Sequence, residues 1–159
     1  MKAPSQLHKI LIAIDDSSYS EIAANYGFEL AKKLDAEVGL LHVSEVPVRT
    51  SFGIDPMLND TTLVMPEMMQ IQEEASKKLL ARFADSYGKE STIHPFLKLG
   101  NPRDEIIATA NEWNADMIIL GTHGRTGLDH FISGSVAESV VRKAKCPVLI
   151  IPKKEKTIE

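Results

Sequence analysis

Unbroken apolar runs constrain the fold of this chain more than any other feature of its sequence. They occur within 9–14, at 117–120 and at 148–151. Strands with one solvated face alternate apolar and polar residues, whereas parallel strands are buried on both faces and read as continuous apolar segments. The runs therefore predict a parallel sheet with helices on both of its faces.

The segments between the strands have the patterns of helices. Apolar residues recur at helical spacing from Ser20 to Leu34, and again from Pro66 to about Tyr87. A third helix is expected after Asn101, with that residue as its N-cap and a proline in the first position. A fourth is expected from Ser135.

Two further strands complete the pattern, at 37–43 and at 91–99. Pro95 removes a backbone donor from the second of them, which favours the edge of the sheet. Strands and helices then alternate strictly, which predicts an α/β fold: one doubly wound domain with a five-stranded parallel sheet. We expect this domain to span 1–159, with an ordered core at about 7–152.

The region before the second helix is the least regular part of the chain. We expect a loop at 44–65, and a loop of this length in a compact domain is usually functional, mobile or both. Met68 and Met69 follow it, and either core packing or a partner surface would suit them; we expect core packing. The helix itself shows one apolar series, which we expect to face inward: Met68, Ile71, Ala75, Leu79 and Phe83.

Two glycine clusters separate the last two apolar runs. Gly121 and Gly124 follow the strand, and nine residues later Gly134 and Ser135 open the last helix. Glycine permits positive φ and close approach of a ligand to the main chain. The free amides and dipole at a helix N-terminus favour an anion. The segment therefore suggests a phosphate cradle, although these glycines could serve only turns.

This glycine pattern resembles that of the universal stress protein family, specifically its nucleotide-binding branch, and the resemblance extends over nearly the whole chain. It implies a Rossmann-like sheet with strand order 3-2-1-4-5, a homodimer, and binding of ATP with Mg²⁺ without efficient catalysis. The last strand, at 148–151, would lie at a sheet edge, where an apolar strand invites pairing with a second copy.

The resemblance also implies where the nucleotide lies. Asp15 would sit beside the ribose and the metal-bound phosphates, which suits an acceptor carboxylate near Mg²⁺; it could instead only cap the first helix, and we expect the ribose role. Val43 would offer its backbone to the purine, with Ala13, Ile14 and Leu120 around it. The complete predicted nucleotide site is Ala13, Ile14, Asp15, Val43, Leu120, Gly121, Thr122, His123, Gly124, Arg125, Gly134, Ser135 and Val136.

Three of these positions have competing interpretations. Ser135 and Glu138 have the spacing of a capping box, with Ser135 as N-cap, which is compatible with a phosphate on the remaining amides. His123 could be a general base, but a hydrogen-bonded loop residue is the commoner role. Arg125 could contact a γ-phosphate or lie in solvent. No residue is assigned as catalytic.

Several functional classes are excluded or disfavoured. A net charge of −4 and a pI near 5.7 argue against nucleic-acid binding, and we expect Lys153, Lys154 and Lys156 to form a solvated tail. The single cysteine, Cys146, excludes an internal disulfide and a cysteine-based zinc site. The chain lacks a P-loop, a Gly-x-Gly-x-x-Gly element and a Gly-x-Ser-x-Gly elbow. Without an apolar signal-peptide core or a membrane-spanning run, we expect a cytoplasmic protein.

Three functions agree with the sequence. The first is an ATP-binding stress protein that acts as a regulatory switch toward protein partners that the sequence does not specify, with little or no hydrolysis. The second is a slow ATPase that uses His123 or Arg125 on the phosphates. The third is a nucleotide-free dimerising module whose glycines form only turns.

Overall fold

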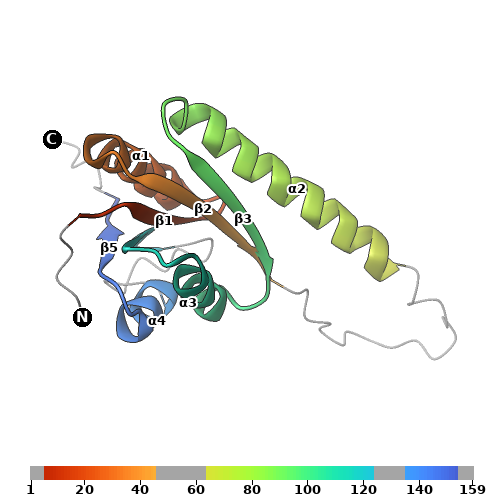
Figure 1. Cartoon of the computed structure of the whole chain (residues 1–159). Helices are drawn as coiled ribbons and strands as arrows, with labels where there is room; N and C mark the ends of the chain where they lie inside the picture. Colours follow the sequence, from red (N-terminus) through yellow and green to blue (C-terminus); the bar gives the residue numbers. More distant parts are fainter. Residues whose placement is uncertain (1–5, 46–63, 124–134, 154–159) are drawn as a thin grey trace, which may run out of the picture.

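The computed structural model describes residues 6–45, 64–123 and 135–153, in which strands and helices alternate along the chain (Figure 1). Gly124, Arg125 and Gly134, and most of the predicted loop at 44–65, lie outside these residues. The elements are β1 (Lys9–Ile14), α1 (Ser18–Leu34), β2 (Glu37–Ser44), α2 (Val64–Tyr87), β3 (Ile93–Leu99), α3 (Pro102–Trp113), β4 (Met117–Gly121), α4 (Ser135–Lys143) and β5 (Val148–Ile151).

The five strands form one parallel sheet in the order β3-β2-β1-β4-β5. Strand β1 lies at its centre, where Ile10 is in register with Val38 of β2 and Met117 of β4. The order reverses between β1 and β4, because the chain first winds outward to β3 and then returns to the other side of β1. The predicted parallel sheet, its strand order and the edge position of Pro95 in β3 are confirmed.

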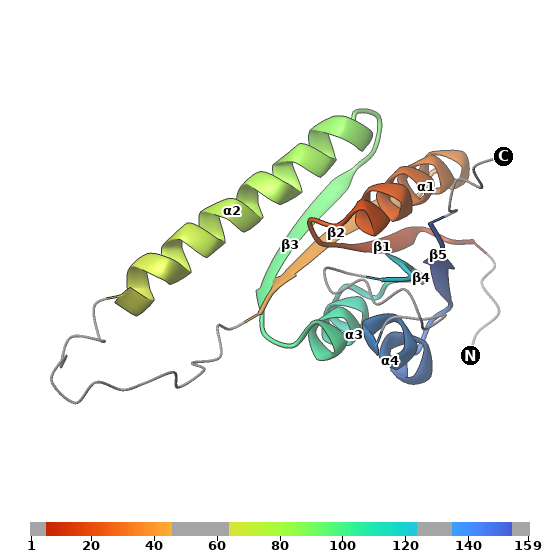
Figure 2. The same cartoon turned by 180° about the vertical axis from the view of Figure 1, so that it is seen from behind.

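Helices cover both faces of the sheet, α1 and α2 on one and α3 and α4 on the other (Figures 1 and 2). Side chains of a strand alternate between the faces. In β1, Ile10 and Ile12 therefore pack toward α1 and α2, whereas Leu11 packs toward α3 and α4. Both faces of the central strand are buried, as the apolar run predicts.

Local side-chain chemistry fixes the helix ends. Ser17 caps α1 by accepting a hydrogen bond from the amide of Ser20, so the helix begins two residues before the predicted start. Asn101 caps α3, as predicted, and accepts from the amide of Arg103 at 2.9 Å. Both helices end at a residue in the left-handed conformation, which closes the last turn.

Helix α2 departs from the prediction at its amino end. Residues 66–71 are all exposed, and the first buried residue after them is Ser76. The expectation that Met68 and Met69 pack in the core is therefore wrong: they are 49% and 43% exposed. The reason is length, since 24 helical residues span about 36 Å and the seven residues of β3 about 23 Å. The amino end of α2 stands clear of the sheet (Figures 1 and 2).

Candidate functional site

The predicted site residues converge on one edge of the sheet. Parallel strands end on the same side, so the carboxyl ends of β1, β2 and β4 meet there, at the point where the strand order reverses. Crevices at such a reversal are the usual ligand sites of doubly wound folds.

Asp15 follows β1 and is held by a compact network. Its Oδ1 accepts from the amide of Ser17 at 2.9 Å and from the hydroxyl of Ser20 at 2.7 Å, and its own amide donates to that hydroxyl oxygen at 2.8 Å. Ser17, not Asp15, is the N-cap of α1. Among the described residues, the recorded bonds of this carboxylate all go to Oδ1, so Oδ2 is the oxygen with capacity for a ligand.

An apolar wall lies beside Asp15, on the α3 and α4 face of the sheet. Ala13 and Leu120 are buried there, and the half-buried Val43 and Val136 pack against the same cluster. These four residues come from three strands and the first turn of α4, and they belong to one apolar cluster at the carboxyl ends of the strands.

Ile14 does not belong to this wall. Its side chain lies in the opposite core with α1, because neighbouring strand residues point to opposite faces. Its carbonyl oxygen accepts a hydrogen bond from Nδ1 of His42 at 2.9 Å. The buried His42 therefore fixes the end of β1 from the α1 and α2 side, a role that the sequence did not indicate because no pattern pairs a strand histidine with a backbone carbonyl.

Gly121 is required by packing at the end of β4. A Cβ atom there would lie 2.9 Å from Cβ and 3.0 Å from the carbonyl oxygen of Tyr19, both closer than atoms normally approach. Thr122 follows, and its amide donates to the carbonyl oxygen of Ile151 at 3.2 Å. Gly121 thus belongs to a strand, whereas the competing interpretation gave it a turn, and it keeps β4 close to the first turn of α1.

His123 packs beside Tyr19 and bonds to its neighbour. The two rings lie 5.1 Å apart and are tilted by 49°, and the imidazole Nδ1 lies 3.1 Å from the hydroxyl oxygen of Thr122. This agrees with a hydrogen-bonded loop residue. Tyr19 was missed by the sequence analysis because it belongs to the helix pattern of α1 and carries no motif of its own.

Lys153 also joins this edge. Its ammonium group donates to the hydroxyl oxygen of Ser18 at 3.1 Å and lies 5.5 Å from the centre of the Tyr19 ring. Lys153 is exposed, as expected of a solvated lysine, and it also contacts the start of α1; Lys154 and Lys156 lie outside the described residues. Lys153 brings a positive charge to the edge that ends in Gly121 and His123.

Helix α4 provides the remaining part of the site. Ser135 is the first residue of the helix, and Val136 is half-buried behind it. The predicted capping box is not formed, because Ser135 lies inside the helix and the carboxylate of Glu138 pairs with Arg142 one turn later at 2.8 Å. The first-turn amides of α4 therefore do not receive the Glu138 side chain.

Comparison with known proteins decides the family. Residues 6–152 match the model of the universal stress protein family. The chain belongs to the universal stress protein family. A universal stress protein of Methanocaldococcus jannaschii is 38% identical over 149 residues, which cover 92% of this chain and 84% of that protein. The universal stress protein YxiE of Bacillus subtilis is 32% identical over 155 residues, covering 91% and 98%.

Solved structures agree with this universal stress protein in fold. Hypothetical protein MJ0577 superposes with a TM-score of 0.79 and 26% identity, over 95% of this chain and 99% of that one. A universal stress protein in complex with cAMP has a TM-score of 0.65 and 20% identity, over 93% and 98%. That of Archaeoglobus fulgidus in complex with dAMP has a TM-score of 0.56 and 23% identity, over 91% and 97%.

Two features are absent from residues 6–45, 64–123 and 135–153 of this universal stress protein. Those residues contain no group of three or more His, Cys, Asp or Glu side chains that could hold a metal ion by themselves. They also contain no helix long and apolar enough to cross a membrane.

Proposed function

We propose that this universal stress protein binds ATP with Mg²⁺ and acts as a nucleotide-dependent regulatory switch in the stress response, with little or no hydrolysis. The observation that carries the proposal is the meeting of Asp15, the apolar wall and the start of α4 at the reversal of strand order. The complexes of related folds with cAMP and dAMP support an adenine nucleotide as the ligand class.

In this proposal each part of the nucleotide meets a different element. The adenine packs on Ala13, Val43 and Leu120, with the backbone of β2 available to its polar edge. The ribose hydroxyls bond to Asp15. The phosphates take the segment that joins β4 to α4, through Gly121, Thr122, His123, Gly124, Arg125, Gly134, Ser135 and Val136.

Mg²⁺ fits this site only in company with the phosphates. A carboxylate oxygen suits so hard a cation, and Asp15 Oδ2 is the candidate. Since the described residues offer no acidic cluster, phosphate oxygens and water would complete its coordination. The metal would neutralise phosphate charge when bound, while Asp15 keeps its place through Ser17 and Ser20.

Binding, not turnover, is the activity that these side chains favour. The His123 ring is packed on Tyr19 and lies next to the Thr122 hydroxyl, so it is poorly placed to activate a water molecule. A ligand that prefers one arrangement of the β4–α4 segment would shift its equilibrium, and partners could read that change.

Two measurements test the proposal. Denaturing the purified protein and identifying released nucleotide by mass spectrometry should give ATP. Titration calorimetry should then show binding of MgATP that Asp15→Asn weakens by about tenfold, the equivalent of one hydrogen bond to a charged group. Absence of both nucleotide and a calorimetric signal would leave the dimerising module as the function. Stoichiometric ADP in a single-turnover assay, lost in Arg125→Ala, would instead establish the ATPase.

We also propose a homodimer through β5. This strand lies at the edge of the sheet, and three of its four residues are only half-buried. An apolar edge with unpaired amides can pair with a second copy. Sedimentation at micromolar concentration should give a dimer, and a monomer would contradict this. Residence in the cytoplasm remains a prediction.

A further inference from the structure

Helix α2 carries an apolar stripe that the rest of the described chain does not cover. Met68 is 49% exposed and Ile71 is 67% exposed, and Ala75 one turn later is exposed as well. The three residues follow helical spacing and lie on one side of the amino-terminal half of α2. We call them the α2 stripe. They belong to the series that the sequence predicted to face inward.

The buried face of α2 lies beside this stripe and does not include it. Ser76, Leu80 and Phe83 are buried against the sheet, and Leu79 is half-buried between that face and the stripe. The apolar surface of α2 is therefore wider than the sheet requires. Scattered apolar side chains are normal on a surface, but a continuous stripe on a protruding helix is typical of an interaction site.

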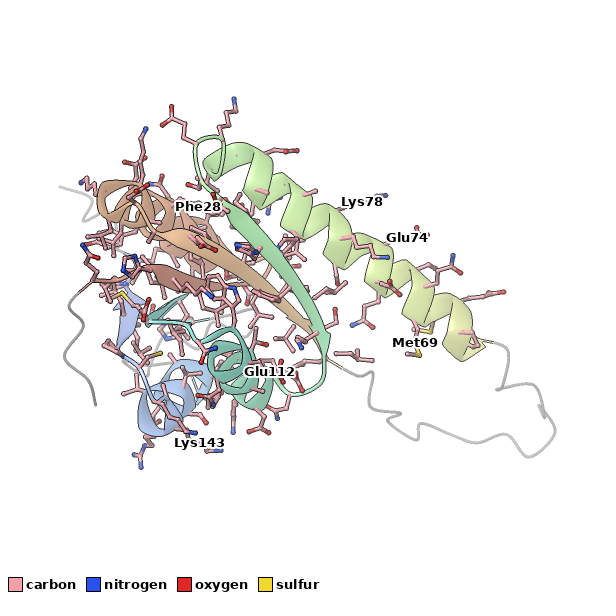
Figure 3. The ribbon with its side chains drawn as sticks, in the orientation of Figure 1. Phe28, Met69, Glu74, Lys78, Glu112 and Lys143 are labelled. Carbon is pink, nitrogen blue, oxygen red and sulfur yellow. The ribbon has the colours of Figure 1, made fainter. Side chains whose placement is uncertain are left out.

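Charge along α2 is divided between its two halves. Residues 64–75 contain three carboxylates and no cation, whereas residues 76–87 contain three cations and one carboxylate. Two helices of this kind repel each other when parallel and attract each other when antiparallel. Figure 3 shows Glu74 and Lys78 on the side of α2 away from the sheet and Met69 near its protruding end. The helix dipoles favour the same antiparallel arrangement.

We propose that the α2 stripe is an interface with a second copy of this chain, in which two α2 helices pack antiparallel about a two-fold axis near Gln72 and Glu73. Ile71 of each copy then faces Ala75 of the other. Glu67 and Lys78 border the stripe on its outer edge, since eleven residues, about three helical turns, separate them. Glu67 of each copy approaches Lys78 of its partner, so the contact repeats itself as a two-fold axis requires.

This interface is separate from the proposed β5 edge and does not depend on nucleotide binding. Strand β5 and helix α2 lie at opposite edges of the sheet, because β5 neighbours β4 whereas α2 packs on β2 and β3. Two independent two-fold contacts on one chain would allow assembly beyond the dimer. The surface available on three helical turns is small, so we expect association in the micromolar range.

The first experiment removes the stripe. Sedimentation velocity of the full chain over a concentration series should show a concentration-dependent step that Ile71→Ser weakens by roughly tenfold or more, because one apolar side chain is lost from each copy. Val141→Ser on α4 is the matched control, since Val141 is likewise an exposed branched apolar residue, and it should leave the step unchanged. Equal association of wild-type protein and Ile71→Ser would overturn the proposal.

The second experiment tests the antiparallel pairing itself. Glu67→Lys and Lys78→Glu should each weaken self-association by about tenfold, because attraction becomes repulsion at both symmetric contacts. An equimolar mixture of the two variants should associate as the wild type does, since each copy supplies the charge that the other lacks. The control is the same pair of changes on α1, Glu29→Lys with Lys33→Glu, which should have no effect.

Failure of the mixture to associate would overturn the second-copy interface. Association of the mixture that persists when Ile71→Ser is added to both variants would overturn it as well. Binding of the stripe to anionic vesicles by monomeric protein would overturn it too, in favour of a lipid surface. Thermal unfolding establishes that each variant is folded, so a protein that binds no nucleotide can still pass every step above.

Discussion

The two ends of the sheet are built in different ways. At the amino ends of the strands, Trp113 lies over Gly39 with the Lys9 ammonium 5.3 Å from its ring, and His94 lies 5.5 Å from it. Asp116 closes the same end by accepting from the amides of His8 and Lys9, both at 2.9 Å.

At the carboxyl ends of the strands, small and polar residues lie where Trp113 lies at the amino ends. Gly121 is the last residue of β4, the Asp15 carboxylate accepts from the Ser20 hydroxyl, and α4 begins with Ser135. Among the described residues, Trp113 thus closes the amino end of this parallel sheet, while the carboxyl end carries the Asp15 carboxylate, Gly121 and the Tyr19–His123 ring pair. The proposed function would therefore place ligand binding at the edge of the sheet opposite the one that Trp113 closes.

The largest expected effect is at the amino end of the sheet. Gly39→Val should destabilise the protein by roughly 3 kcal/mol, because even a Cβ atom would lie 2.8 Å from Trp113 Cζ3 and 2.9 Å from Leu11 Cδ1. Urea denaturation measures the loss. MgATP affinity well below the unfolding midpoint should be unchanged, and a loss of affinity would contradict the separation of the two ends.

Gly121→Ala should affect nucleotide binding more than stability, the reverse of Gly39→Val. We expect a smaller destabilisation, about 2 kcal/mol, since the added methyl group meets the Tyr19 main chain and must displace the first turn of α1. Because that turn orients Asp15 through Ser17 and Ser20, calorimetry should show MgATP binding weakened by at least about tenfold. Unaltered affinity would show that the glycine serves packing alone.

Asp116→Asn refines the description of the amino end. The amide oxygen can still accept from the two backbone amides but without a charge, so we expect a loss of about 1 kcal/mol in the free energy of unfolding. The comparison is with Asp15→Asn at the other end, which should lower nucleotide affinity more than stability. Equal effects of both variants on stability and on binding would contradict the separate roles of the two ends of the sheet.

The smallest effect concerns Glu21, which joins α1 to α2. Burial by itself raises the pKa of this carboxyl group, but hydrogen bonds from Tyr87 at 2.6 Å and from Arg82 outweigh it and lower the pKa below its usual range. A lowered folded-state pKa means that the stabilisation is complete above the unfolded value of about 4.3 and is lost as the pH falls through the folded value.

Because the Arg82 side chain is half exposed, we expect Glu21→Gln to cost less than about 1 kcal/mol at pH 7. The difference between wild type and variant should shrink in denaturation curves as the pH falls below the unfolded-state pKa of about 4.3 and through the lower folded-state pKa. A difference that persists in acid would show that the contact is not electrostatic.

Much of the fold was accessible from the sequence, for identifiable reasons. Unbroken apolar runs occur when a strand is covered on both faces, so the parallel sheet followed from β1 and β4 directly. Strand order did not, because periodicity says nothing about which strands are neighbours; the resemblance to a family provided it. Asn101 and Pro102 fixed the start of α3, since capping chemistry is local.

The sequence analysis made wrong predictions, or missed residues, where parts of the chain that are distant in sequence meet in the fold. Helical spacing shows that Met68, Ile71 and Ala75 share a side, but only the length of the sheet decides whether that side is covered. Tyr19 and Lys153 reach the candidate site from a helix and from the end of β5, and neither has a local signature. Strand alternation alone could have separated Ile14 from Ala13.

The position of Trp113 has a practical consequence. Trp113 is the single tryptophan of the chain, so intrinsic emission excited at the indole comes from the closed end alone. A ligand at the opposite edge would change the tryptophan signal only by stabilising the folded state. A hundredfold excess of ligand over Kd would add about 2.7 kcal/mol to the free energy of unfolding, and the melting temperature would rise with ligand concentration. If the proposed nucleotide binds at the opposite edge, tryptophan fluorescence would report its occupancy through the unfolding transition, since Trp113 lies at the amino ends of the strands.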